Sequence, residues 1–144
     1  MFRVTRRYRL AASHRLHAEA LSEEENRQTF GKCNNPFGHG HNYIVEVSAR
    51  GPLDERTGRA IDPAKLDTLV TREIIAPLDH RNLNLDVDWF AGAVPTTENL
   101  TSEIQRRLSD SWESTFPGEW PKLEKIRILE TPRNIFETES HEIK

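Results

Sequence analysis

The feature that most constrains the fold is a pair of long segments in which apolar and polar residues alternate and which carry histidines. Residues two apart in a β-strand point to the same face, so the alternation predicts one strand over residues 2–14 and another over 39–50. His14 ends the apolar face of the first segment, and His39 and His41 begin the apolar face of the second. We expect the two segments to pair as antiparallel strands with the three histidines at one end.

Three histidines that meet from adjacent strands suit a zinc ion, because neutral imidazole is a good zinc ligand. No fourth protein ligand is obvious, and three protein ligands plus water is the arrangement of a catalytic zinc. We therefore expect His14, His39 and His41 to hold Zn²⁺, and we expect His17 and His141 at the surface. The alternative is that all of them are ordinary core or surface histidines.

Cys33 and Glu130 are the other candidate site residues, whereas the pair Asp79-His80 is by itself unremarkable, because adjacent Asp and His are common at loop and helix ends. Cys33 lies in a polar Gly-Lys-Cys-Asn-Asn context beside the proposed cation, which favours a thiolate that acts as base or nucleophile. Alternatively it is a fourth zinc ligand and the site is structural. Glu130 continues the apolar face of a later strand, where a carboxylate suits a guanidine-like ligand edge, although a strand-end glutamate in water is an open alternative.

The sequence pattern of the remaining segments predicts two helices and two more strands. Residues 15–35 are polar and are expected to form a long excursion that could hold a helical turn. The predicted elements after it are a helix from Asp62-Pro63 to just before Pro77, a loop over 78–83, a helix opened by 95–98 and closed by Pro117-Gly118, a strand around Ile126 and Ile128, and a short strand over 135–138. This order predicts an α+β domain with a four-stranded antiparallel sheet and both helices on one face.

Length and composition fit one globular domain over residues 1–144 and exclude several function classes. The net charge of −3 and the pI near 6.1 argue against nucleic acid as the main partner, since phosphate binding needs a basic face. A single cysteine forms no internal disulfide and fits a reducing compartment. No window approaches 18 apolar residues, so we expect no membrane association and a cytoplasmic protein.

Several stretches resemble the 6-pyruvoyl-tetrahydropterin synthase family in their order and spacing. They are residues 12–17, 30–36, 38–43, 77–83, 96–99 and 130–131, and they run over nearly the whole chain. The resemblance implies the tunnelling fold, in which trimers close a β-barrel from three sheets and two trimers stack into a homohexamer. It implies zinc on the three histidines.

The resemblance also implies a reaction and the residues that perform it. The family converts 7,8-dihydroneopterin triphosphate to 6-pyruvoyl-tetrahydropterin with loss of triphosphate, as in tetrahydrobiopterin biosynthesis. Cys33 would abstract a proton, and Asp79 and His80 would act as a relay on the opposite side of the reacting bond. The residues implied at the pterin ring are Glu130, as its anchor, with Thr96 and Glu98 close by.

Two alternative functions stay open. A cousin of the same fold, 6-carboxy-tetrahydropterin synthase of queuosine and deazapurine biosynthesis, uses the same substrate, zinc and residue set. A zinc-bound pterin-binding protein without catalysis is the second alternative, against which the retention of Cys33, Asp79 and His80 speaks. Phe37 departs from the smaller polar residue typical of the family, which puts details of the substrate in doubt.

The triphosphate must meet positive charge, and three side chains are candidates for that role. They are Arg15, Lys32 and Arg81, each of which is otherwise an ordinary surface charge. A site at a subunit interface would also draw on basic groups of a neighbouring copy.

Overall fold

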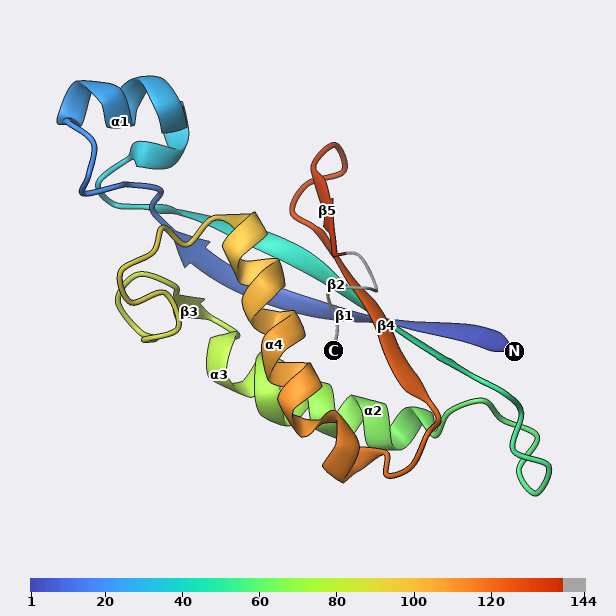
Figure 1. Cartoon of the computed structure of the whole chain (residues 1–144). Helices are drawn as coiled ribbons and strands as arrows, with labels where there is room; N and C mark the ends of the chain where they lie inside the picture. The colour runs from blue at the N-terminus through green and yellow to red at the C-terminus, as the bar shows by residue number, and fades with distance from the viewer. Residues whose placement is uncertain (139–144) are drawn as a thin grey trace.

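The computed structural model describes residues 1–138, in which a long twisted sheet carries the helices on one face (Figure 1). The strands are β1 (Phe2–His14), β2 (His39–Gly51), β3 (Arg81–Asn82), β4 (Lys122–Leu129) and β5 (Ile135–Glu137). The helices are α1 (Glu23–Phe30), α2 (Pro63–Val70), α3 (Ala76–Leu78) and α4 (Thr97–Thr115), with a 3₁₀ turn over Gly31–Asn34 and a π-helical segment over Thr71–Ile75. The strands lie in the order β3, β1, β2, β4, β5.

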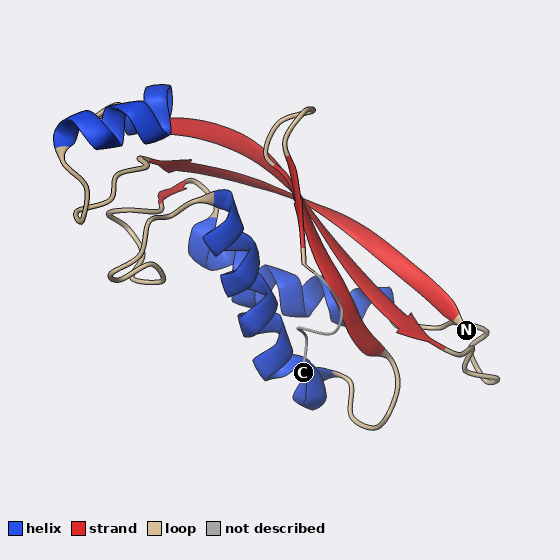
Figure 2. Ribbon diagram, turned by 45° about the horizontal axis from the view of Figure 1, so that its top comes forward, coloured by secondary structure: helices blue, strands red, loops and turns tan. Residues whose placement is uncertain are grey.

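The antiparallel pair of β1 and β2 is the longest element, as the alternation predicts. Its register runs without a break from Phe2 opposite Gly51 to His14 opposite His39. The apolar residues of both strands face the helices, and those near the middle of β2, Val45 and Val47, are fully buried. Figure 2 shows α2 and α4 on that face, with the other face of the sheet uncovered. The predicted α+β class is confirmed.

The sheet has a fifth strand that the alternation does not predict. β3 lies inside the segment expected to be a loop, and it pairs in parallel with β1 at Ala12 and Ser13. The His80 N–H donates to Ala11 O at 2.6 Å and the Leu83 N–H donates to Ser13 O at 2.8 Å. Two residues are too few to show a period, so only the pairing with β1 reveals this strand.

The excursion between β1 and β2 contains a complete helix, α1, where the sequence suggested at most a helical turn. Ser22 caps the helix: its hydroxyl accepts from the Glu25 N–H at 3.1 Å, and the Glu25 carboxylate accepts from the Ser22 N–H at 3.0 Å. The buried Asn26 ties the helix to the preceding loop through hydrogen bonds with Ala18. A polar helix of this kind lacks an apolar stripe, so it depends on its cap and on these bonds.

The first long helix continues through Pro77, and the prediction that it ends before this residue is wrong. Within the π-helical segment the Ala76 N–H bonds to Thr71 O, five residues back. Pro77 directly follows this wider turn, in the first turn of α3, and having no N–H it makes no hydrogen bond back into the turn. The helix therefore reaches Leu78 and delivers Asp79 directly beside β1.

Arg6 interrupts the apolar face of β1, and the structure gives the reason. Its guanidinium binds the Asp67 carboxylate of α2 with two hydrogen bonds of 2.8 and 2.7 Å. The Tyr8 hydroxyl donates to the same carboxylate at 2.7 Å. These side-chain contacts attach the first half of β1 to α2 in the helical layer.

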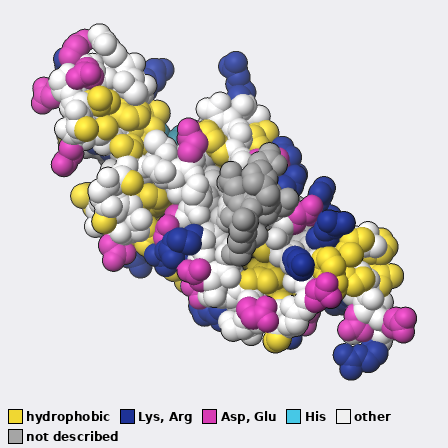
Figure 3. All heavy atoms as spheres, in the orientation of Figure 1, with side chains coloured by type: hydrophobic (Ala, Val, Ile, Leu, Met, Phe, Trp, Pro, Cys, Tyr) yellow, Lys and Arg dark blue, Asp and Glu magenta, His cyan; other side chains and the backbone are white. Residues whose placement is uncertain are grey.

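Exposed apolar side chains gather at the end of the molecule that holds the N-terminus (Figure 3). Met1, Phe2 and Leu53 are each at least half exposed there. Across residues 1–138 no helix has the length and apolar character that crossing a membrane requires. His141, expected at the surface, lies outside the described residues.

Candidate functional site

The three histidines predicted as ligands meet at one end of the β1–β2 pair. In the strand register His14 lies opposite His39, and His41 lies opposite Ala12. One ring nitrogen from each imidazole can be chosen so that all three lie within 4.8 Å of one another. His14 Nε2 is 3.2 Å from His39 Nε2. The period of two along both strands puts the three side chains on one face, and the register of the pair brings them together.

The protonation of His14 suits a metal ligand. Its Nδ1 lies 2.8 Å from Pro95 O, and because a carbonyl only accepts, Nδ1 carries the proton and Nε2 is left with a free lone pair. Burial lowers the pKa of His14, which favours the neutral imidazole that a metal binds. His39 Nδ1 and His41 Nε2 are buried without a hydrogen-bond partner among the described residues. This donor set fits a bound cation.

Gly38 allows the loop after the 3₁₀ turn to approach His14 closely. Its φ of +74° lies in the left-handed region, and a Cβ at this position would be 3.1 Å from His14 O. A side chain here would therefore be strained in backbone conformation and crowded against β1. The glycine delivers β2 to β1 in the register that places the histidines together.

Cys33 is half-buried in the 3₁₀ turn. It lines the same pocket as His39, and this pocket has a volume of about 900 Å³. The Leu16 N–H donates to Cys33 O at 2.8 Å, which holds this turn against the segment after β1. The pKa of the thiol is raised, first by burial and then by the Glu130 carboxylate. The protein groups alone thus disfavour the thiolate. The expectation of a thiolate included a cation on the histidines, which would favour it, and it stays a prediction.

Glu130 directly follows β4 and reaches the histidines. One carboxylate oxygen accepts a hydrogen bond from the Thr97 hydroxyl, and the other is 4.0 Å from His41 Nε2. The Tyr43 hydroxyl is buried without a partner among the described residues, and the Tyr43 ring centroid is 5.4 Å from that of His41. Sequence reasoning missed both Thr97 and Tyr43, because a threonine at a helix start and a core tyrosine look purely structural.

The two other residues expected near the ligand lie at the start of α4. The Thr96 hydroxyl is used as the helix cap, since it accepts from the Asn99 N–H at 3.1 Å. Glu98 is exposed in the first turn. Their contact with a pterin stays a prediction.

The Asp79-His80 pair lies at the edge of β1 that pairs with β3, opposite the edge that pairs with β2. Asp79 Oδ1 accepts from the Ala11 N–H at 2.9 Å, and Asp79 Oδ2 is 3.5 Å from His80 Nε2. His80 is exposed, with a φ of 61°. It lines a second pocket of about 420 Å³ together with His41, and Cys33 is not part of that lining. Within one chain the thiol and the proposed relay therefore open into different pockets.

Two further predictions concern residues around Cys33. His17 is half-buried, where a surface residue was expected, because its Nδ1 is 3.0 Å from the amide nitrogen of the buried Asn34. Sequence reasoning did not single out Asn34, since asparagine after a cysteine in a loop carries no signal of burial. Phe37 is 94% exposed among the described residues, so its ring is almost entirely open to solvent.

Comparison with known proteins agrees with this geometry. The family model described as 6-pyruvoyl tetrahydropterin synthase matches residues 3–141. The 6-pyruvoyl tetrahydrobiopterin synthases of Poecilia reticulata and Homo sapiens are 46% and 45% identical over 132 residues, which cover 92% of this chain and 86% and 87% of those proteins. The solved structure of Caenorhabditis elegans 6-pyruvoyl tetrahydropterin synthase matches with a TM-score of 0.85 and 40% identity, and the match covers 96% of this chain and 94% of that one. The chain belongs to the 6-pyruvoyl tetrahydropterin synthase family.

Proposed function

We propose that this protein is a zinc-dependent lyase that converts 7,8-dihydroneopterin triphosphate to 6-pyruvoyl-tetrahydropterin and releases triphosphate. The observation that carries the proposal is the meeting of His14, His39 and His41 with Cys33 and Glu130 at one end of the sheet. Zinc is the metal we propose, because three imidazoles that leave a position for substrate suit a catalytic zinc. The proposal also draws on the names of the relatives.

In this proposal Glu130 anchors the pterin. Its carboxylate can accept two hydrogen bonds from the amino group and ring N–H of the pterin, which form a guanidine-like edge. The hydroxyl of Thr97 donates to one of its oxygens and so fixes the plane of the carboxylate. Because Glu130 is half-buried, these bonds are made in a partly desolvated place, where they are stronger than in water.

Proton transfer falls to Cys33 and His80. A bound zinc would supply Lewis-acid chemistry that acidifies the C–H next to the side-chain oxygens of the substrate. Cys33 takes that proton, and His80, held by Asp79, returns a proton to a ring carbon. The ring is reduced as the side chain is oxidised, so no nicotinamide or flavin is needed, and triphosphate leaves from the side chain.

The proposed enzyme is a homohexamer built as a dimer of trimers. Two features of the chain support an oligomer. Within residues 1–138, the ladder on the outer edge of β1 covers only Ala12 and Ser13, so most of this strand can pair with another copy. Cys33 and His80 open into different pockets, so a neighbouring copy is needed to place a thiol and a relay on one substrate.

The test is product analysis. Purified protein, zinc and 7,8-dihydroneopterin triphosphate are incubated without reductant, and the products are identified by mass spectrometry. We expect the mass of 6-pyruvoyl-tetrahydropterin and free triphosphate. Acetaldehyde with 6-carboxy-tetrahydropterin would assign the chain to the other activity instead, and absence of turnover in zinc-loaded protein would leave a pterin-binding protein.

A matched variant separates catalysis from binding. Cys33→Ala removes the proposed base and leaves the three histidines and Glu130 in place. We expect it to bind zinc and the pterin normally and to lose turnover. An unchanged turnover rate would exclude Cys33 as the base.

A further inference from the structure

The pocket that contains Cys33 and His39 is bordered by basic side chains from three parts of the chain. Arg15 follows β1, Arg27 belongs to α1 and Lys32 belongs to the 3₁₀ turn, and a single carboxylate lies among them, that of Glu23. The whole chain has a net charge of −3, so this positive charge is a local feature. A pocket with this charge next to the reacting residues suits an anionic part of the ligand.

Two of these cations are available to a ligand. The one side-chain hydrogen bond of Arg15 runs from Nε to Asn34 O at 3.2 Å, and among the described residues Arg15 has no ion pair. Lys32 is exposed, and its side chain has no partner in the described part of the chain. Arg27, in contrast, already pairs with Glu24 at 2.5 Å. Arg15 and Lys32 are therefore the free donors of the pocket.

His17 adds a neutral donor whose tautomer the structure fixes. The Asn34 amide nitrogen is 2.8 Å from Leu16 O, which only accepts, so this atom is the NH₂ group of the amide. The same nitrogen is 3.0 Å from His17 Nδ1. An NH₂ group only donates, so Nδ1 accepts and the proton of the neutral imidazole is on Nε2. His17 lines the pocket, so this N–H is a candidate donor to a ligand there.

Arg81, the third candidate from the sequence, has less suitable surroundings. It lines the pocket of His80 together with Asp86, and it lines a neighbouring pocket together with Asp86 and Asp88. The carboxylates of Asp86 and Asp88 in these two pockets would repel a polyanion. The charge around Arg81 is therefore balanced or negative, whereas the charge around Arg15 and Lys32 is positive.

We propose that Arg15, Lys32 and His17 form the binding site for the triphosphate group of the substrate. Cys33 and His39 line the same pocket, so the group that leaves is held beside the residues proposed to act on the reacting side chain. The identity of the ligand rests on the proposed function, but the chemistry of the site, a polyanion on two cations and an imidazole N–H, does not. Charge-assisted hydrogen bonds to guanidinium and ammonium provide most of the affinity.

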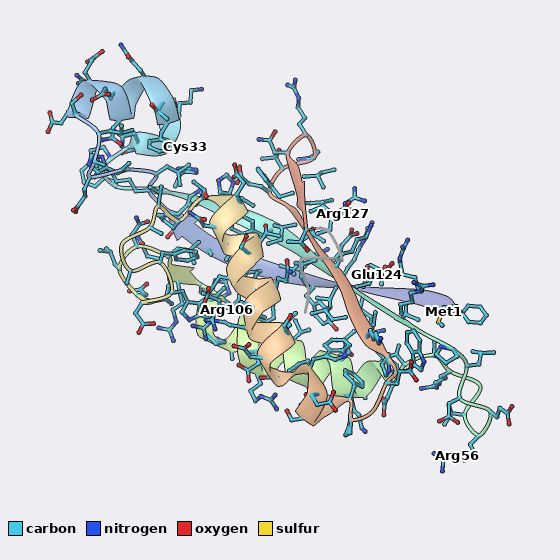
Figure 4. All side chains as sticks on the ribbon, in the orientation of Figure 1. Met1, Cys33, Arg56, Arg106, Glu124 and Arg127 are labelled. Carbon is cyan, nitrogen blue, oxygen red and sulfur yellow. The ribbon has the colours of Figure 1, made fainter. Side chains whose placement is uncertain are left out.

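The test is binding of inorganic triphosphate to the full-length protein by calorimetry, with zinc content measured before and after each titration because triphosphate chelates zinc. Lys32→Gln is the decisive variant, since its exposed side chain supports no other contact. Arg15→Gln is the second. Arg81→Gln tests the rival position, and Arg56→Gln is the control, because Figure 4 places Arg56 at the opposite end of the molecule from Cys33.

We expect Lys32→Gln and Arg15→Gln each to weaken triphosphate binding roughly tenfold or more, the usual size of a hydrogen bond to a charged group. Arg81→Gln and Arg56→Gln should bind like the wild type, and binding of dihydroneopterin without phosphates should be the same in all variants. No detectable binding to the wild type, unchanged binding in Lys32→Gln, or a loss in Arg81→Gln overturns the assignment.

The two proposals fail in different ways. Triphosphate binding that depends on Lys32, in a protein that forms no pterin product, supports the binding site and removes the proposed function. Product formation with triphosphate binding that does not depend on Lys32 or Arg15 supports the function and removes the binding site.

Discussion

Replacing Asn34 by alanine tests how the structure holds Cys33 in place. Asn34 is 8% exposed, and its amide nitrogen donates to Leu16 O at 2.8 Å and to His17 Nδ1 at 3.0 Å. Each bond contributes about 0.5–1.5 kcal/mol to stability, so we expect the free energy of unfolding to fall by about 1–3 kcal/mol. For a chain of this length, each kcal/mol lowers Tm by roughly 2–4 °C.

The assay is urea unfolding followed by circular dichroism, with two matched variants. Asn34→Asp keeps the size of the side chain but places an acceptor against the Leu16 carbonyl, so it should lose at least as much stability as alanine. Asn35→Ala changes the exposed neighbour, whose Oδ1 accepts one hydrogen bond from the Phe37 N–H at 3.1 Å, and should lose less than about 1 kcal/mol.

The same variants are compared in the alkylation of Cys33. Loss of the bonds to Leu16 and His17 should free the 3₁₀ turn, so iodoacetamide should react faster with Asn34→Ala than with Asn35→Ala. Equal stability losses in the two alanine variants, or full stability in Asn34→Asp, would refute the assignment of these two bonds as the attachment of the turn.

Three further predictions concern the site and the helical layer. His14→Ala should abolish stoichiometric zinc binding in equilibrium dialysis while His17→Ala retains it, and equal retention would remove His14 from the metal site. Glu130→Gln should lower the pKa read from the pH dependence of Cys33 alkylation in metal-free protein, because the Glu130 carboxylate raises it; an unchanged midpoint contradicts that cause. Hydrogen bonds from Arg6 lower the pKa of Asp67, so Asp67→Asn should lose up to about 1 kcal/mol at neutral pH, since the pair is half exposed. This difference should shrink as the pH falls through the pKa of Asp67 in the folded protein, and a pH-independent difference between pH 7 and 3 in urea unfolding would contradict the ion pair.

The strands and the histidine site could be predicted from the sequence because both depend on a period of two. The alternation along β1 and β2 places His14, His39 and His41 on one face, and the antiparallel register then sets His14 opposite His39. Glu130 could be placed for the same reason, since it continues the face of β4. These features need no knowledge of the rest of the fold.

The features that were missed depend on contacts distant in sequence or on local hydrogen bonds. β3 exists because β1 offers a partner, and Thr97 reaches Glu130 only when α4 packs beside the end of β4. The continuation through Pro77 depends on the π-helical turn before it. α1 did carry a readable signal, the Ser22-x-x-Glu25 capping box, which the lack of an apolar stripe concealed.

The position of the histidines at both ends of the excursion has a consequence for folding. An ion held by His14 and His39 joins two points of the chain about 25 residues apart, and in the chain-entropy model such a cross-link stabilises a fold by roughly 3–4 kcal/mol. The segment that it closes contains α1, Cys33 and Asn34. Loss of such an ion should therefore raise hydrogen exchange in this segment first, before the β2–β4 core opens, so that the ion would set the local stability of the segment that it closes.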